Sequence, residues 1–203
     1  LMTESVLKDK TLKEKFKNIK KIYFSRRKFG KAVATEFGEE YIEQCFNQNG
    51  YESLGPETLT LREQIYVWNH AEAIACMNGT IPLNVVFCKN EKLKLTILNK
   101  MSIYHKNPYI YLYMRNIQAE FIDIYKEPLK GYPKSLGEGP YLIKTGKEFF
   151  HYCQREKFEI PYTGMKLKFY DLKQEIRYYL CVIGIGNKIR RVGSYIKRKM
   201  LRR

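Results

Sequence analysis

The stretch Ala73-Ile74-Ala75-Cys76-Met77-Asn78-Gly79-Thr80-Ile81-Pro82-Leu83-Asn84 decides the fold that the sequence predicts. Its apolar beginning is typical of a buried strand, and its polar tripeptide is typical of a turn. Pro82 then favours the start of a short helix. Ligands of open α/β sheets bind beyond the carboxyl ends of the strands, where helix N-termini favour anions. We therefore expect a binding site at Asn78, Gly79 and Thr80.

Four more short apolar runs surround this stretch, and helical patterns separate them. We expect the central strand over residues 71–77 and further strands over 21–25, 51–54, 93–98 and 121–125, the fourth with alternating apolar and polar residues. Strands that alternate with helices are typical of a parallel sheet with right-handed crossovers. The predicted fold class is therefore α/β, with a Rossmann-like parallel sheet flanked by helices and a helical C-terminal extension.

Threonines mark the predicted starts of three helices. Thr60 is followed by Glu63 at the spacing of a capping box, and further helices are expected to begin at Thr35 and Thr145. A short helix is also expected over residues 82–88. Another is expected to begin at Asn107-Pro108 and to turn four residues inward: Tyr109, Leu112, Tyr113 and Ile117.

The excess of positive charge lies mainly at the two ends of the chain. The 203 residues include 37 Lys and Arg against 21 Asp and Glu, which gives a net charge of +16. Such a charge favours polyanionic partners: nucleic acid, an anionic membrane surface or phosphorylated substrates. We expect a solvated basic helical connector (1–20), a Rossmann-like domain (21–130), and a loop and helical extension that ends in a basic tail (131–203). The start at Leu1-Met2 favours a partial chain.

The cysteines and histidines indicate no metal site. Five scattered cysteines without CxxC spacing, together with three histidines, argue against a disulfide scaffold and against structural zinc. They favour a reducing compartment. The Lys- and Glu-rich start is unlike a signal peptide, and no apolar run reaches about 18 residues. We therefore expect a cytoplasmic protein that contacts the inner face of the plasma membrane peripherally.

Several pieces of the sequence, taken in order, resemble a known family. A strand ends in Ser25-Arg26-Arg27, and a Glu-rich helix follows it. Then come Gly50-Tyr51-Glu52, the run PETLTLREQI at 56–65 and the run NGTIPLNVVF at 78–87. Over residues 22–100 this ordered set resembles glycosyltransferase family 61, in particular its bacterial capsular and exopolysaccharide members.

The resemblance implies a GT-B-like fold, of which this chain is the C-terminal, nucleotide-sugar-binding half. It implies inverting transfer of a sugar from a nucleotide diphosphate donor to a saccharide or lipid-linked oligosaccharide acceptor, with no metal and no other cofactor. The departing diphosphate then needs fixed cations or N–H dipoles to neutralise its charge, because no metal does so. Arginines and a helix N-terminus meet that need.

The resemblance also implies positions for the binding residues. Arg26 and Arg27 would face the phosphates of the donor, and the turn Asn78-Gly79-Thr80 would lie beneath it. The remaining implied site residues come from the second helix, its lead-in and the helix after the turn: Glu57, Glu63, Gln64 and Asn84.

Leu83 departs from the family pattern, which usually has a His immediately before Asn84. Leucine can neither bind a phosphate nor move a proton, so activity is impaired here or depends on another residue. We assign no general base, since in GT-B enzymes this group often belongs to the other half. His70 and His105 are expected to be packing or surface residues.

Two other functions stay open at this point. A basic nucleic-acid-binding module agrees with the charge and the aromatic content, although no RNP-like motif appears and we expect no nucleic acid partner. A catalytically inactive relative in a saccharide pathway agrees with Leu83. Residues 187–203 are predicted to lie on an anionic membrane as a basic amphipathic helix, and residues 178–186 to belong to the core or an interface.

Overall fold

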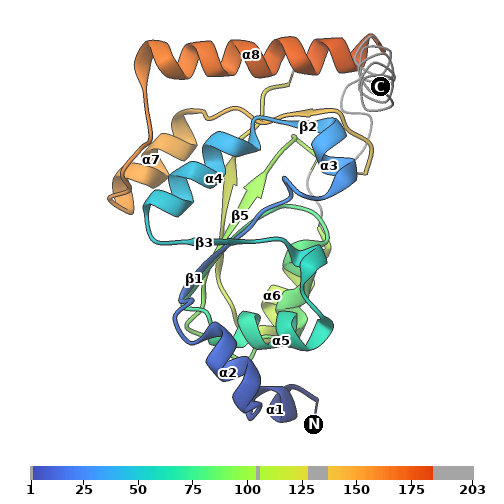
Figure 1. The fold of residues 1–203 in the computed structure, drawn as a ribbon, viewed down its shortest axis with the longest axis vertical. Helices are drawn as coiled ribbons and strands as arrows, with labels where there is room; N and C mark the ends of the chain where they lie inside the picture. The colour runs from blue at the N-terminus through green and yellow to red at the C-terminus, as the bar shows by residue number, and fades with distance from the viewer. Residues whose placement is uncertain (1, 104–105, 128–136, 185–203) are drawn as a thin grey trace, which may run out of the picture.

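The centre of the molecule is a five-stranded parallel sheet, seen in a computed structural model that describes residues 2–103, 106–127 and 137–184. The strand order is β3-β1-β4-β5-β6, and every neighbouring pair is parallel (Figure 1). The strands are β1 (Lys21–Phe24), β3 (Glu52–Leu54), β4 (Ala73–Met77), β5 (Lys94–Asn99) and β6 (Ala119–Asp123). The predicted Rossmann-like sheet is therefore confirmed.

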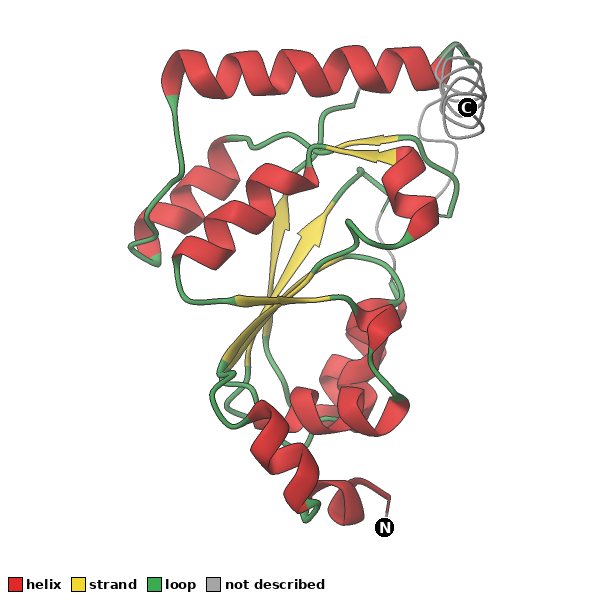
Figure 2. Cartoon of the chain, viewed as in Figure 1, coloured by secondary structure: helices red, strands yellow, loops and turns green. Residues whose placement is uncertain are grey.

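The central strands are buried on both faces, because helices cover both sides of the sheet (Figure 2). All five residues of β4 are buried, as are all residues of β5 except Lys94. The predicted alternation of β5 is therefore wrong as a burial pattern. Its polar Thr96 is buried too, within hydrogen-bond distance (3.2 Å) of the Tyr152 hydroxyl.

One face of the sheet is covered by α5 (Leu61–His70), the 3₁₀ segment η2 (Ile81–Phe87) and α6 (Asn107–Arg115). Residues 2–16 extend this layer as α1 (Met2–Leu7) and α2 (Lys10–Phe16), which both contact α5. Val6, Leu12 and Phe16 are buried there. The expectation of a solvated connector is wrong, since these apolar side chains join the main core. The division into three parts stays a prediction.

The other face is covered by α4 (Glu39–Gln48), α7 (Lys147–Arg155) and the long α8 (Gly164–Val182). Aromatic rings dominate this layer, with Phe46 in contact with several of them, including Tyr23 and Phe149. Tyr178 is buried and packs against Phe37, as expected for the apolar run that begins there. Residues 187–203 lie outside the described residues.

The segment after β1 differs most from the prediction. A short helix, α3 (Gly30–Thr35), leads into β2 (Glu36–Phe37), which pairs in parallel with β7 (Tyr141–Leu142). Thr35 therefore ends a helix instead of capping one. Gly38 is the N-cap of α4, with φ at 106°, and a Cβ there would lie 2.1 Å from the carbonyl oxygen of Ile143. Only glycine fits this position.

Of the two other predicted N-caps, one is confirmed and one is wrong. Thr60 caps α5 in a complete capping box with Glu63, beyond the 3₁₀ turn η1 (Pro56–Thr58). Thr145 does not cap α7, whose N-cap is Gly146, and its hydroxyl is buried without a described partner. In α6, Leu112 faces inward as predicted, but Tyr113 is 90% exposed. None of the described helices is long and apolar enough to cross a membrane.

Candidate functional site

A large cavity between described residues lies at the point where the strand order of the sheet reverses. From β1 the chain moves to β3 on one side and then to β4 on the other, so β1 and β4 are neighbours whose next elements diverge. Ligands of open α/β sheets bind at such a switch point, beyond the carboxyl ends of the strands. A cavity of about 730 Å³ opens there. Its volume suits a ligand of several hundred daltons.

Six of the nine predicted site residues line this large cavity. They come from the ends of β1 and β4, from η1, from α5 and from η2: Arg26, Glu57, Gln64, Gly79, Thr80 and Asn84. Residues that lie more than 50 positions apart in the sequence therefore share one wall, as the parallel sheet requires. Leu83 is not among the described residues that line the cavity, although its neighbour Asn84 is.

The other three predicted residues have different surroundings. Arg27 turns away from the cavity and donates to Glu43, with 2.6 Å between Nη1 and Oε2. Glu63 completes the capping box with Thr60 and pairs with Lys15. Asn78 is buried directly after the end of β4, and Gly79 and Thr80 follow it in the chain.

Asn78 begins a row of hydrogen bonds across three strand ends. Its Nδ2 donates to Oδ1 of Asn99 at 2.8 Å, and Nδ2 of Asn99 donates to Oδ1 of Asp123 at 2.8 Å. The backbone N–H of Asn78 donates to the carbonyl of Leu98. The buried Oδ1 of Asn78 has no partner among the described residues. The row ties β4, β5 and β6 together, and Gly79 and Lys100, which directly follow Asn78 and Asn99 in the chain, line the cavity.

Two cations at the cavity share one buried carboxylate. Glu36 accepts from Nε of Arg26 at 3.2 Å and from Nζ of Lys100 at 2.8 Å, and only 3% of its side chain is exposed. Burial lowers the pKa of Lys100, and Arg26 adds to that effect while Glu36 opposes it. A buried cation that shares its only counter-ion with a second cation is stabilised by the binding of a further anion. The part of the cavity wall formed by Arg26 and Lys100 therefore favours the binding of an anion.

Glu39 holds the turn that carries Arg26. Its Oε1 accepts from the backbone N–H of Arg26 at 2.9 Å and from the Tyr23 hydroxyl at 3.1 Å. Burial raises the pKa of Glu39 to about 7, and the negative charge of Glu36 adds to the shift, while both hydrogen bonds oppose it. Near neutral pH the carboxyl group is therefore divided between its two protonation states.

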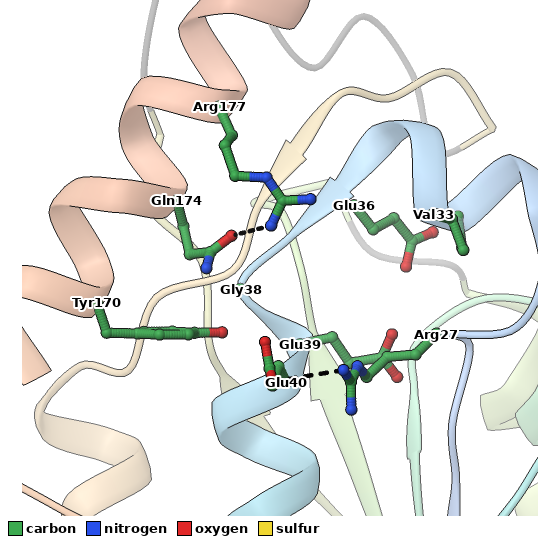
Figure 3. Close-up of a pocket in the computed structure, with 10 residues that line it drawn as sticks. Arg27, Val33, Glu36, Gly38, Glu39, Glu40, Tyr170, Gln174 and Arg177 are labelled. Carbon is green, nitrogen blue, oxygen red and sulfur yellow. Dashed lines mark hydrogen bonds and ion pairs between the residues drawn. The ribbon is translucent and has the colours of Figure 1, made fainter. Parts of the chain in front are cut away.

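A second, smaller hollow lies on the other side of Glu36. It has a volume of about 160 Å³ and is lined from α4, α8 and the turn after β1 (Figure 3). Arg27 forms an ion pair with Glu40 there at 3.5 Å, and Arg177 donates to Gln174 at 2.9 Å. Its carboxylates already outnumber its cations, so it is a poor site for an anion.

Gln64 and Asn84 position the elements at the cavity mouth. Nδ2 of Asn84 donates to Oε1 of Gln64 at 2.8 Å, which links η2 to α5. Nε2 of Gln64 donates to the carbonyl groups of Pro56 and Leu59, which fixes η1 and with it Glu57. Both side chains use polar atoms internally, so their first role is to hold the wall in place.

The sequence prediction missed Glu36, Lys100 and Tyr141. Lys100 directly follows β5, just as Arg26 lies just beyond β1, so the rule of strand ends would have found it. Its ammonium lies 4.1 Å from the ring centre of Tyr141. Glu36 belongs to β2, and no sequence pattern predicted that strand or its pairing with β7.

The described residues contain no cluster of three or more His, Cys, Asp or Glu side chains that would suit a metal ion. All five cysteines are free. The expectation of transfer without metal stays a prediction.

The family comparison agrees with this geometry. The family model described as Glycosyltransferase 61 matches residues 2–95. This segment belongs to glycosyltransferase family 61. The match confirms the predicted family and, with it, a glycosyltransferase as the general class of enzyme. The chain has no significant match among curated proteins or solved structures.

The family 61 segment contains all nine predicted site residues, but not the whole cavity. It ends within β5, five residues before Lys100. Lys100 and Tyr141 therefore complete the cavity from outside the matched segment.

Proposed function

We propose that this chain binds the donor of a glycosyltransferase reaction, in which a sugar passes from a nucleotide diphosphate to a saccharide acceptor. The observation that supports this most directly is the shared carboxylate of Glu36. Arg26 and Lys100 together carry two positive charges against its single negative charge, at the wall of a cavity of about 730 Å³. A diphosphate supplies the missing negative charge.

The proposed reaction is inverting and needs no metal. The acceptor hydroxyl attacks the anomeric carbon, and the bond from that carbon to the diphosphate oxygen breaks. The nucleoside diphosphate leaves with the electron pair, and the hydroxyl proton passes to a base. Arg26 and Lys100 would stabilise the charge that grows on the leaving diphosphate, which is the largest electrostatic demand of this transfer. We assign no base within this chain.

We further propose that the chain is the donor half of a GT-B enzyme in bacterial capsular or exopolysaccharide biosynthesis. The parallel sheet, the cavity at its switch point and the family 61 match support the donor half. The acceptor, a saccharide or a lipid-linked oligosaccharide, would then bind mainly on another half. A cytoplasmic setting agrees with five free cysteines.

Donor binding can be tested with two adjacent arginines. A uridine diphosphate sugar should raise the melting temperature of the chain, and isothermal titration should give its dissociation constant. Arg26→Ala should weaken binding about 10- to 100-fold, because one charge-assisted contact with phosphate is lost. Arg27→Ala is the matched control, since its guanidinium is paired with Glu43 and Glu40 away from the cavity. Equal losses in both variants would refute the assignment of the phosphate site.

A catalytically inactive relative is the second candidate, and Leu83 favours it. The residue is half-buried in η2 and offers no proton or hydrogen bond. Donor binding without turnover by the full-length enzyme, with turnover gained by Leu83→His, would support this alternative. If instead oligonucleotides bind with a steep salt dependence and nucleotide sugars do not, both saccharide proposals fail.

A further inference from the structure

The longest of the described helices presents an uncovered apolar face. α8 has 19 residues and so extends for about 28 Å along one end of the molecule (Figure 1). Leu167, Gln174 and Tyr178 on its inner side are buried, which fixes its orientation. The outer side is therefore a defined surface that the body of the protein holds in place.

Large apolar side chains recur along this outer side at helical spacing. They are separated by four, three, four and seven residues and are each between 52% and 67% exposed: Met165, Phe169, Leu172, Ile176 and Ile183. This spacing places the first four on one stripe of the helix, and Ile183, the C-cap residue, continues the same spacing. A continuous exposed stripe of this kind marks a surface that something else covers.

The charges beside the stripe have one sign. Lys166, Lys168 and Lys173 are exposed on its two flanks. The side chains of the two acidic residues of the helix are mostly buried and are already paired, Glu175 with Lys126 at 2.7 Å and Asp171 with Lys144 at 3.9 Å. The outer face of α8 therefore combines apolar side chains with uncompensated positive charge.

We infer that this outer face of α8 lies on an anionic membrane surface. Apolar side chains between lysines suit the boundary between headgroups and acyl chains, where the lysines meet lipid phosphates. The helix is not apolar enough to cross a bilayer, so it would lie in the plane of the surface. A second copy fits worse, because pairing of two such helices would bring lysines against lysines. This inference does not rest on the proposed sugar transfer.

The test is co-sedimentation of the full chain with vesicles of phosphatidylcholine that contain phosphatidylglycerol. Met165→Ser with Phe169→Ser should lower the affinity about tenfold or more, since two apolar side chains no longer enter the lipid. The matched control is Ile110→Ser with Met114→Ser on α6, where the side chains are equally exposed and four residues apart. This control should bind vesicles like the wild type.

Charge is tested separately by Lys168→Glu with Lys173→Glu, against Lys92→Glu with Lys94→Glu as the control pair. Only the first pair should reduce the preference for anionic over pure phosphatidylcholine vesicles. A fluorescence test uses Phe169→Trp, because the native Trp68 is fully buried. Its emission should shift to the blue with anionic vesicles, and that of Ile110→Trp should not.

The inference is overturned if the α8 variants bind vesicles as tightly as their α6 and Lys92 controls. It is also overturned if sedimentation velocity shows a dimer that Met165→Ser with Phe169→Ser dissociates while vesicle binding is unchanged. The same variants should bind a uridine diphosphate sugar like the wild type. A loss there would concern the donor site and not the membrane face.

Discussion

The large cavity and the small hollow lie on either side of Glu36. The two sites differ in how far carboxylates neutralise the arginine that each contains. Three cations and two carboxylates line the large cavity, whereas two cations and three carboxylates line the small hollow. Arg26 shares the carboxylate of Glu36 with Lys100. Its neighbour Arg27 forms ion pairs with two carboxylates, those of Glu43 and Glu40. An arginine beside a cavity therefore predicts an anion site only when the nearby carboxylates do not already neutralise it.

Removal of the shared carboxylate should have the largest effect. Glu36→Gln keeps the size of the side chain but leaves Arg26 and the buried Lys100 without a counter-ion. The free energy of unfolding near pH 7 should fall by about 3–5 kcal/mol, as for other broken buried pairs. The loss should shrink as the pH is raised above neutral, because burial lowers the pKa of Lys100 and its neutral form needs no partner. Urea unfolding at several pH values measures this.

The control for this variant is Glu40→Gln in the small hollow. Its carboxylate is 45% exposed, so the cost should stay below about 1 kcal/mol. Inorganic pyrophosphate should restore part of the stability lost by Glu36→Gln only if it binds at Arg26 and Lys100. A Glu36→Gln protein as stable as the wild type would refute the picture of two cations on one carboxylate.

Glu39→Gln should change how stability depends on pH. The pKa of Glu39 is raised from 4.5 to about 7 on folding, so between these values the folded state binds more protons than the unfolded state. The free energy of unfolding of the wild type therefore falls as the pH rises through this window. Gln keeps an oxygen acceptor for Arg26 and Tyr23 but releases no proton.

Relative to the wild type, Glu39→Gln should gain on the order of 3 kcal/mol between about pH 4.5 and pH 8, since each pKa unit corresponds to about 1.4 kcal/mol. Urea unfolding at several pH values checks this. Parallel curves for the two proteins would show that Glu39 titrates normally.

Arg27→Gln should have the smallest effect. The side chain is 44% exposed, so solvent screens its ion pairs with Glu40 and Glu43. The free energy of unfolding should fall by about 1 kcal/mol or less, and more at low salt than at high salt. Thermal unfolding at two salt concentrations measures this. A loss of unfolding free energy as large as that of Glu36→Gln would show that the ion pairs of the two sites contribute equally to stability, contrary to the comparison.

The sequence predicted features that depend on signals close together in the chain. Thr60 and Glu63 stabilise each other reciprocally, and this pair marked the start of α5 correctly. Thr35 has no such partner and Thr145 has Glu148 at the same spacing, yet both predicted caps were wrong. Glu148 instead accepts a hydrogen bond from the backbone N–H of Asp123, so a tertiary contact replaces the reciprocal pair that the spacing would allow.

The candidate site was only partly predictable for a similar reason. Strand ends identified Arg26 and the turn at Gly79 and Thr80, since parallel strands bring their carboxyl ends to one edge. Nothing near Glu36 in the sequence predicts its contact with Lys100, because the pairing of β2 with β7 connects positions more than 100 residues apart. The opposite directions of Arg26 and Arg27 also follow from tertiary contacts alone.

The hydrogen-bond row of Asn78, Asn99 and Asp123 has a consequence for how the protein can diverge. Each residue stands at the last position of a strand or just beyond it, so the loops that leave the strands start from points already tied to one another. Insertions in those loops can then reshape the rim while the floor stays in register. If the cavity binds the proposed donor, its specificity can evolve at the rim without rebuilding the rest of the site.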